Sequence, residues 1–177
     1  TFEPDTHKGS EWIIENPDGD ITWQMYEVGG TVPGNTAAGI DLGIYQSIGQ
    51  RDRLITPPYN LEGMESAWLE FQHAYAKKYE DYTDSLIVYI STNCGNSWTR
   101  ILTAGDDGSG NFATHEMTGN FWPQVRSDWC MDGWGAGCFA INLEQWAGEN
   151  EVKFAFETYS YYGNPIFIDN ITISQFV

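Results

Sequence analysis

Hydrophobic and polar residues alternate along several short segments of this chain, with the two-residue period of a half-buried β-strand. The alternation is clear in residues 66–75 (SAWLEFQHAY) and 151–158 (EVKFAFET). Residues 84–90 (DSLIVYI) form a continuous apolar run, which indicates a strand covered on both faces, and residues 165–173 (PIFIDNITI) are again strand-like. The side chains expected to face a core in the two alternating segments are Leu69, Phe71, Tyr75, Val152, Phe154 and Phe156. We therefore predict a strand in each of the four segments.

Helical periodicity is nearly absent. The best local exception is a helical turn over residues 143–146, with Asn142 as a candidate N-cap. Short strands separated by Gly, Pro, Asn and Asp predict an all-β sandwich or barrel, and the lack of a repeat of about 40 residues disfavours a propeller. Nothing resembles a linker, so we expect residues 1–177 to form one domain.

The charge balance argues against two classes of binding partner, nucleic acids and anionic membranes. The 177 residues include 25 acidic and 8 basic side chains, for a formal net charge of −17. Nucleic-acid binding requires cationic surface and is excluded on this ground, and binding to an anionic membrane is disfavoured. Two interpretations of the acidity remain open: a solvated surface that maintains solubility, or carboxylates that converge on Ca²⁺.

We expect a secreted protein, because 15% aromatic and only 19% charged residues are typical of extracellular β-proteins. No run approaches the ~20 apolar residues of a membrane helix, and the chain starts at Thr1, so we expect a mature or excised piece of a larger protein. Of three cysteines, Cys94, Cys130 and Cys138, we favour pairing the last two, which lie eight apart in a Trp- and Gly-rich stretch. The other two pairings stay open. Zinc is disfavoured because no Cys or His pair has ligand spacing.

One motif predicts a tight hairpin. Residues 91–98 (STNCGNSW) fit the Asp-box pattern, with Asn93 in the Asp position. Asn93 can hydrogen-bond its own turn, Gly95 can supply a positive φ, and Trp98 can pack beneath the turn. This is a structural motif and carries no catalysis.

Catalytic motifs are incomplete in this sequence. His115 and Glu116 match the start of a zincin motif, but position 119 is Gly instead of the second His. A nucleophile elbow, a phosphate loop and the carboxylate cluster of one jelly-roll glycosidase family are all missing. Pairs of carboxylates occur, but none in a context that separates an acid from a base. We expect a protein that is not an enzyme and rank a hydrolase last.

Acidic residues form three candidate cation sites. Residues 16–20 (NPDGD) and 105–111 (GDDGSGN) resemble cation loops, although a plain Asp-Gly turn is favoured for both. The third candidate joins Glu3, near the start of the chain, to Asp169, in its last predicted strand. Terminal strands of a sandwich often lie side by side, and an inward Asp169 requires compensation that Ca²⁺ would supply.

The order of motifs resembles the MAM-like and cleaved-adhesin jelly rolls of secreted Bacteroidetes proteins, and reelin subrepeats are similar in joining a jelly roll to one Asp-box hairpin. The resemblance covers almost the whole chain. It rests on Phe2-Glu3, NPDGDITW (16–23), GNTAAGI (34–40), GQRDRLITPPYNL (49–61), DSLIVYISTNCGNSWTRI (84–101), INLEQWAGENEVKFAF (141–156) and GNPIFIDNI (163–171). The insertion at residues 127–138 departs from the family pattern.

This resemblance implies a jelly-roll β-sandwich of two antiparallel sheets with structural Ca²⁺. The ligands carried over are Glu3, Asn35 in place of a more usual Asp, and Asp169, and we add Asp5 for its proximity to Glu3. Such domains are non-catalytic accessory or adhesion domains at the cell surface or in secreted proteins. Their expected partners are catalytic domains, for example a metalloprotease, or adhesin domains of the same parent chain.

The alternative function is a carbohydrate-binding module. Residues 103–136 are the least regular part of the chain, and loops at one end of a sandwich commonly carry the binding surface. The candidate ligand-binding residues are Trp122, Asp128, Trp129, Asp132 and Trp134. Their indole rings would stack on the sugar rings of a polysaccharide or of a host or matrix glycoprotein.

Overall fold

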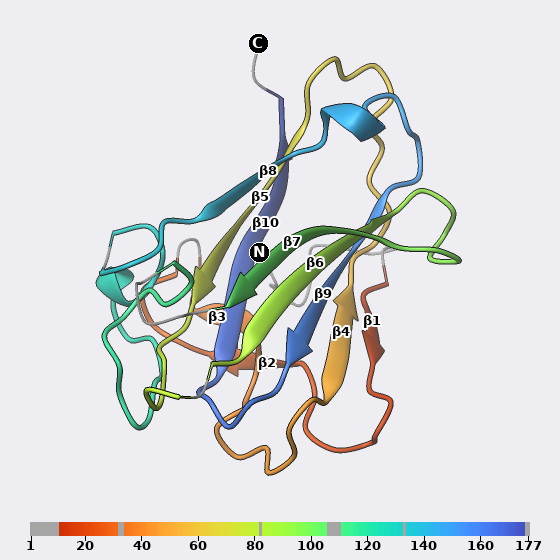
Figure 1. Ribbon diagram of the computed structural model, residues 1–177. Coiled ribbons are helices and arrows are strands. Elements are labelled where there is room, and N and C mark those ends of the chain that lie inside the picture. The colour runs from red at the N-terminus through yellow and green to blue at the C-terminus, as the bar shows by residue number, and fades with distance from the viewer. Residues whose placement is uncertain (1–10, 32–33, 82, 106–110, 133, 176–177) are drawn as a thin grey trace.

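The computed structural model describes residues 11–31, 34–81, 83–105, 111–132 and 134–175, which fold into two antiparallel five-stranded sheets packed face to face (Figure 1). The first sheet has the order β1-β4-β9-β6-β7 and the second the order β2-β3-β10-β5-β8. The strands are β1 (Ile13–Glu15), β2 (Gln24–Glu27), β3 (Thr36–Ile40), β4 (Arg51–Ile55), β5 (Trp68–Ala74), β6 (Ser85–Ser91), β7 (Thr99–Gly105), β8 (Phe139–Asn142), β9 (Lys153–Tyr159) and β10 (Ile166–Ser174). The predicted all-β jelly-roll sandwich is confirmed.

The four strands predicted from periodicity are β5, β6, β9 and β10, and together they form the centre of both sheets. Their inward side chains make the main core between the sheets. Phe71 of β5 and Phe156 of β9, for example, meet edge to face with ring centroids 5.1 Å apart. The helical turn is a short 3-10 helix over Glu144–Trp146, and Asn142 Oδ1 accepts the Glu144 N–H at 2.7 Å.

Residues 91–98 form the predicted hairpin between β6 and β7. Asn93 Oδ1 accepts hydrogen bonds from the Ser91 hydroxyl (2.9 Å) and the Ser97 N–H (2.9 Å). Gly95 has φ +86° and packs against the Trp98 ring. Short polar side chains thus close the turn on itself.

Glu157 on β9 lies on the outer face of the first sheet but is only 3% exposed. Two neighbouring arginines of β4 cover it: Arg51 lies 2.5 Å and Arg53 2.7 Å from its carboxylate oxygens. The Tyr89 hydroxyl donates to the same carboxylate at 3.2 Å. A buried carboxylate is compensated here by two guanidinium groups.

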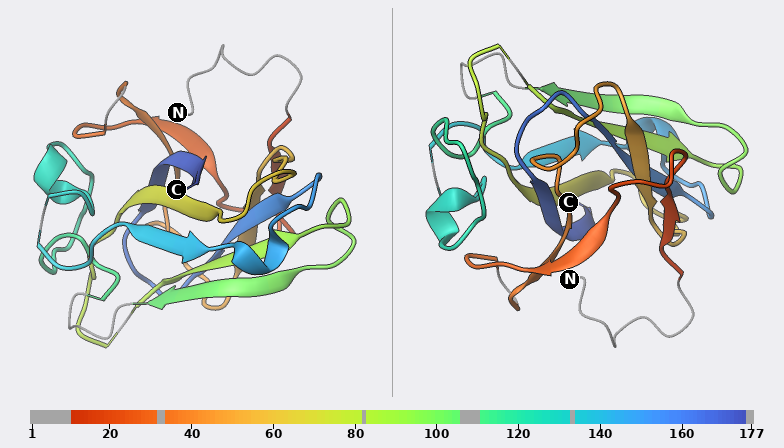
Figure 2. Two further views of the ribbon diagram at one scale, coloured as in Figure 1. Left: turned by 90° about the horizontal axis from the view of Figure 1, so that it is seen from above. Right: turned by 90° about the horizontal axis from the view of Figure 1, so that it is seen from below.

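The connection between β7 and β8 covers the outer face of the second sheet. We call residues 111–132 and 134–138 the covering loop; Figure 2 shows it in teal, gathered on one side of the sandwich. It encloses a second apolar cluster on that face, which consists of Val28, Ala37, Ala74, Ala76, Phe121, Trp129 and Phe167. The molecule therefore has a core on each side of its second sheet. No helix in the described ranges is long and apolar enough to span a membrane.

Candidate functional site

The covering loop is attached to β5 through the backbone. Pairing of β5 with β8 ends at Phe71, opposite Phe139. Beyond that point, the Cys130 N–H donates to the carbonyl of His73 at 3.0 Å, and the Thr114 N–H donates to the carbonyl of Tyr75 at 2.8 Å. The loop thus continues the hydrogen bonding of the sheet edge, which fixes its position on the sandwich.

Cys130 and Cys138 form a disulfide, as predicted, with a Cα–Cα distance of 4.7 Å. Cys94 is an exposed free thiol at the tip of the β6–β7 hairpin. The disulfide joins the part of the loop that bonds to β5 to the residue directly before β8. Both ends of the Trp-rich insertion are therefore anchored to the second sheet.

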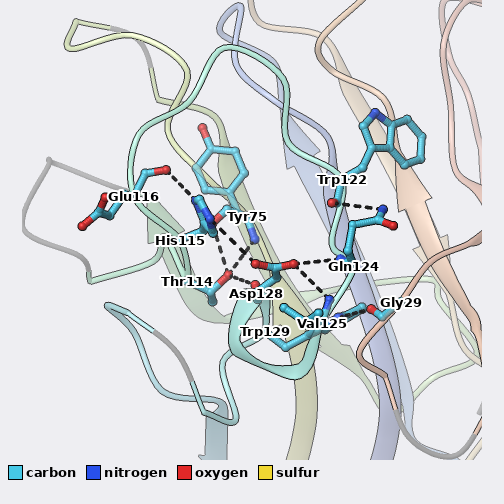
Figure 3. Close-up of polar contacts among 10 residues, drawn as sticks. All are labelled: Gly29, Tyr75, Thr114, His115, Glu116, Trp122, Gln124, Val125, Asp128 and Trp129. Atoms are coloured by element: carbon cyan, nitrogen blue, oxygen red, sulfur yellow. Dashed lines mark hydrogen bonds and ion pairs between the residues drawn. The ribbon is translucent and has the colours of Figure 1, made fainter.

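The prediction that Trp129 binds ligand is wrong, because its side chain is fully buried in the second apolar cluster. Its indole N–H donates to the carbonyl of Gly29 at 2.8 Å (Figure 3). Gly29 has no room for a side chain, since a Cβ there would lie 1.9 Å from the carbonyl oxygen of Gln124. Trp129 fastens the covering loop to the β2–β3 turn and offers no face to a sugar.

Trp122 is one of two predicted tryptophans that reach the surface, together with Trp134. Its side chain is 38% exposed. One side of the indole rests on Tyr26 of β2 (centroids 5.2 Å apart, interplanar angle 76°) and on Phe167 of β10 (5.1 Å, 57°). Tyr26 and Phe167 also meet each other edge to face at 5.9 Å. Three mutually packed rings hold the exposed indole in one orientation.

Asp128 forms hydrogen bonds and an ion pair within the covering loop. One carboxylate oxygen accepts the backbone N–H groups of Gln124 (2.8 Å) and Val125 (3.1 Å), and the other lies 3.7 Å from His115 Nε2 (Figure 3). The carbonyl of Asp128 accepts the Thr114 hydroxyl at 2.7 Å. Asp128 thus shapes the turn directly after Trp122 and supports that indole indirectly.

Asp132 and Trp134 are exposed residues of the covering loop. The Asp132 side chain is 75% exposed and its carboxylate is 3.7 Å from Arg126 Nε, a surface ion pair. Trp134 is 45% exposed. Both side chains are accessible to a ligand.

The predicted calcium ligands are only partly described. Glu3 and Asp5 lie outside the described residues. Asp169 is completely buried on β10, where its carboxylate accepts a hydrogen bond from the Thr31 hydroxyl, and Asn35 is exposed just before β3. Among the residues that the structure describes, no group of three or more His, Cys, Asp and Glu side chains converges in a metal-ligating arrangement.

The loop at residues 16–20 closes on its own polar groups. Asn16 Oδ1 accepts the Gly19 N–H at 2.9 Å, and Asp18 Oδ1 accepts the Asp20 N–H at 3.1 Å. A hydrogen bond from the Tyr45 hydroxyl lowers the pKa of Asp18. This is the Asp-Gly turn that the sequence favoured. Most of the other candidate loop, residues 106–110 of 105–111, lies outside the described part of the chain.

Two features of the structure were missed by sequence reasoning. His73 on β5 is fully buried between Phe112 and Phe139, with ring centroids 5.3 and 4.9 Å away, and burial lowers its pKa to about 4. A groove between the loops that precede β4, β6 and β10 is lined in part by Tyr79 and Tyr162. Neither position lies in a motif, so no local signal identifies them.

Comparisons with known proteins bear on the fold. The K1 cleaved adhesin domain of Lys-gingipain from Porphyromonas gingivalis W83 aligns over 95% of this chain and 98% of its own, with a TM-score of 0.59 and 17% identity. The K2 cleaved adhesin domain of Lys-gingipain aligns over 99% and 97%, with a TM-score of 0.59 and 16% identity. TmCBM61, solved in complex with β-1,4-galactotriose, aligns over 93% and 88%, with a TM-score of 0.53 and 9% identity.

No family model and no curated protein matches the sequence. At these identities the structural likeness shows the fold alone. The chain has the adhesin-type jelly roll that its motif order indicated, and carbohydrate-binding modules share that sandwich.

Proposed function

We propose that this chain is a non-catalytic accessory domain of a larger extracellular protein and that it binds polysaccharide through Trp122 of the covering loop. The exposed, firmly supported indole of Trp122 is the observation that carries the proposal. A rigid aromatic surface loses little conformational entropy on binding, which favours affinity. The fold is shared with cleaved adhesin domains and with carbohydrate-binding modules, and both likenesses are consistent with an accessory domain that binds polysaccharide.

Saccharide is the ligand class that fits the residues around this indole. The apolar face of a pyranose ring can stack on Trp122, while polar groups of the same loop reach the sugar hydroxyls. The Gln124 side chain lies beside Trp122, and its amide donates to the Trp122 carbonyl at 3.4 Å (Figure 3). Trp134 and Asp132 extend the accessible surface of the loop.

The first test is native electrophoresis in gels that contain galactan, mannan, xylan or β-glucan. We expect wild-type protein to be retarded by at least one polysaccharide, and Trp122→Ala to raise the apparent Kd about tenfold. The control is Ile14→Ala, an exposed apolar residue on the edge strand β1, which should migrate as wild type. Wild-type mobility unchanged in all four gels contradicts the proposal.

The proposal includes one structural calcium ion. Asp169 is buried on β10 beside the Thr31 hydroxyl, and a buried carboxylate with hydroxyl support suits the hard-oxygen preference of Ca²⁺. Glu3, Asp5 and Asn35 are the further ligands that we assign to it. The ion would join the start of the chain to its last strand.

Calcium binding is tested by thermal unfolding. An ion at one hundred times its Kd stabilises a folded domain by about 2.7 kcal/mol, which raises Tm by roughly 5–10 °C at this size. We expect Tm to fall with EGTA and to recover with Ca²⁺ but not with Mg²⁺. In Asp169→Asn the response to Ca²⁺ should be absent. Equal Tm values in EGTA and Ca²⁺ for wild-type protein overturn this part.

A further inference from the structure

We propose a second saccharide-binding site, in a groove formed by the loops before β4, before β6 and before β10. The groove has a volume of about 490 Å³ and is lined by Gly43, Ile44, Tyr45, Gln46, Lys78, Tyr79 and Tyr162. The inference rests on the proposed function, since it assigns a second surface to the same class of ligand. It involves none of the residues of the covering loop.

Exposed aromatic and apolar side chains form the walls of this groove. Tyr79 is 50% exposed, Tyr162 is 39% exposed and Ile44 is 62% exposed. Large apolar groups gathered around a concavity indicate a ligand surface. Two tyrosine rings with hydroxyl groups at their tips suit a pyranose, which has an apolar face and a polar rim.

Tyr162 is held in an unfavourable backbone conformation. Its φ of +59° lies in the left-handed region, which bulky residues rarely adopt. The backbone N–H groups on either side of it, those of Tyr161 (2.6 Å) and Gly163 (3.3 Å), both donate to Asp84 Oδ1. Two N–H groups that flank Tyr162 thus converge on one carboxylate oxygen, and these hydrogen bonds compensate the strain.

Asp84 is itself fixed from the other side. It is fully buried, and its second oxygen accepts the Tyr75 hydroxyl at 3.1 Å. Gly163 cannot carry a side chain, because a Cβ there would lie 1.5 Å from Asp84 Oδ2. The buried carboxylate thus locks the β9–β10 loop to the end of β5 and directs Tyr162 into the groove lining.

The polar groups of the groove favour a neutral sugar. Lys78 Nζ donates to the Gly43 carbonyl at 3.2 Å and lies 5.5 Å from the centroid of the Tyr79 ring, so one of its three N–H groups is already used. The chain carries a formal net charge of −17, which repels an anionic polysaccharide. Gln46 and the Lys78 ammonium remain as groups that can hydrogen-bond to sugar hydroxyls.

The test compares Tyr79→Ala/Tyr162→Ala with Tyr79→Phe/Tyr162→Phe in native gels that contain galactan, mannan, xylan or β-glucan. We expect the alanine pair to raise the apparent Kd about tenfold and the phenylalanine pair to stay within about threefold of wild type, because the rings carry the contact. A second variant, Ile44→Arg, fills the groove without altering either tyrosine and should weaken retardation as well. Circular dichroism melts verify that the variants fold.

Each outcome decides between the two sites. If wild type is retarded and both the alanine pair and Ile44→Arg migrate as wild type does, the second site is wrong and the Trp122 proposal stands. If the phenylalanine pair loses as much affinity as the alanine pair, ring stacking is wrong. If no polysaccharide retards wild type, the proposed function fails, and the second site fails with it.

Discussion

At the scale of single residues, three buried titratable side chains, His73, Asp84 and Asp52, make the stability of the molecule depend on pH. His73 stacks between two phenylalanines, and its Nε2–H donates to the Phe112 carbonyl at 2.8 Å. Complete burial lowers its pKa to about 4, which favours the neutral ring. Asp84 is buried with its pKa raised to about 6 by burial. Asp52 is also buried; burial and the nearby charges of Asp18 and Asp20 raise its pKa to about 6.

These residues predict the response of stability to pH. The folded state lowers the pKa of His73 from 6.5 to about 4, so the unfolded chain binds the proton more readily. The contribution of His73 is complete above pH 6.5 and is lost as the pH falls toward 4, by roughly 3 kcal/mol. Asp52 and Asp84 act in the opposite direction, because their raised pKa values mean that the folded state binds the proton more tightly than the unfolded chain does. Their contribution to stability is complete below pH 3.8 and is lost as the pH rises through 6.

The prediction is checked by urea unfolding of wild type and His73→Phe between pH 4 and 8. Phenylalanine keeps the stacking but cannot take a proton. We expect the difference in unfolding free energy between the two proteins to shift in favour of the variant as the pH falls from 6.5 to 4. A difference that is the same at every pH contradicts the assignment, whatever constant offset the lost hydrogen bond produces.

At the scale of elements, the strands could be predicted from the sequence and the covering loop could not. The two-residue period of 151–158 is a local property, and it identified β9 because the inward side of that strand packs on a continuous core. The hairpin at 91–98 was predictable for the same reason, since its hydrogen bonds lie within eight residues.

The covering loop depends on contacts that are distant in sequence. Trp129 fits a space on the outer face of the second sheet that exists because Ala37 and Ala74 are small there. Nothing near residue 129 indicates that space, so a buried anchor was predicted to be a binding residue. The orientations of Trp122 and Tyr162 could not be predicted either. The Trp122 ring is supported by Phe167 and the backbone around Tyr162 by Asp84, and both partners are distant in the sequence.

At the scale of the whole molecule, the sandwich positions its candidate surfaces at one end. Trp122 packs on Phe167, the second residue of β10, and Tyr162 lies in the loop that leads into the same strand. The calcium assigned to Asp169 would lie further along β10. One strand therefore supports both proposed saccharide surfaces and the proposed ion, and we expect damage to β10 to affect all three.

The central claim, that Trp122 contacts saccharide, is tested most directly by NMR of the indole N–H signals during titration with galactan, mannan, xylan or β-glucan oligosaccharides. Trp129 is the internal reference, because its indole N–H is buried and bonded to Gly29. We expect at least one oligosaccharide to shift the Trp122 signal in a saturable manner while the Trp129 signal stays in place. If no oligosaccharide moves the Trp122 signal, the claim is contradicted.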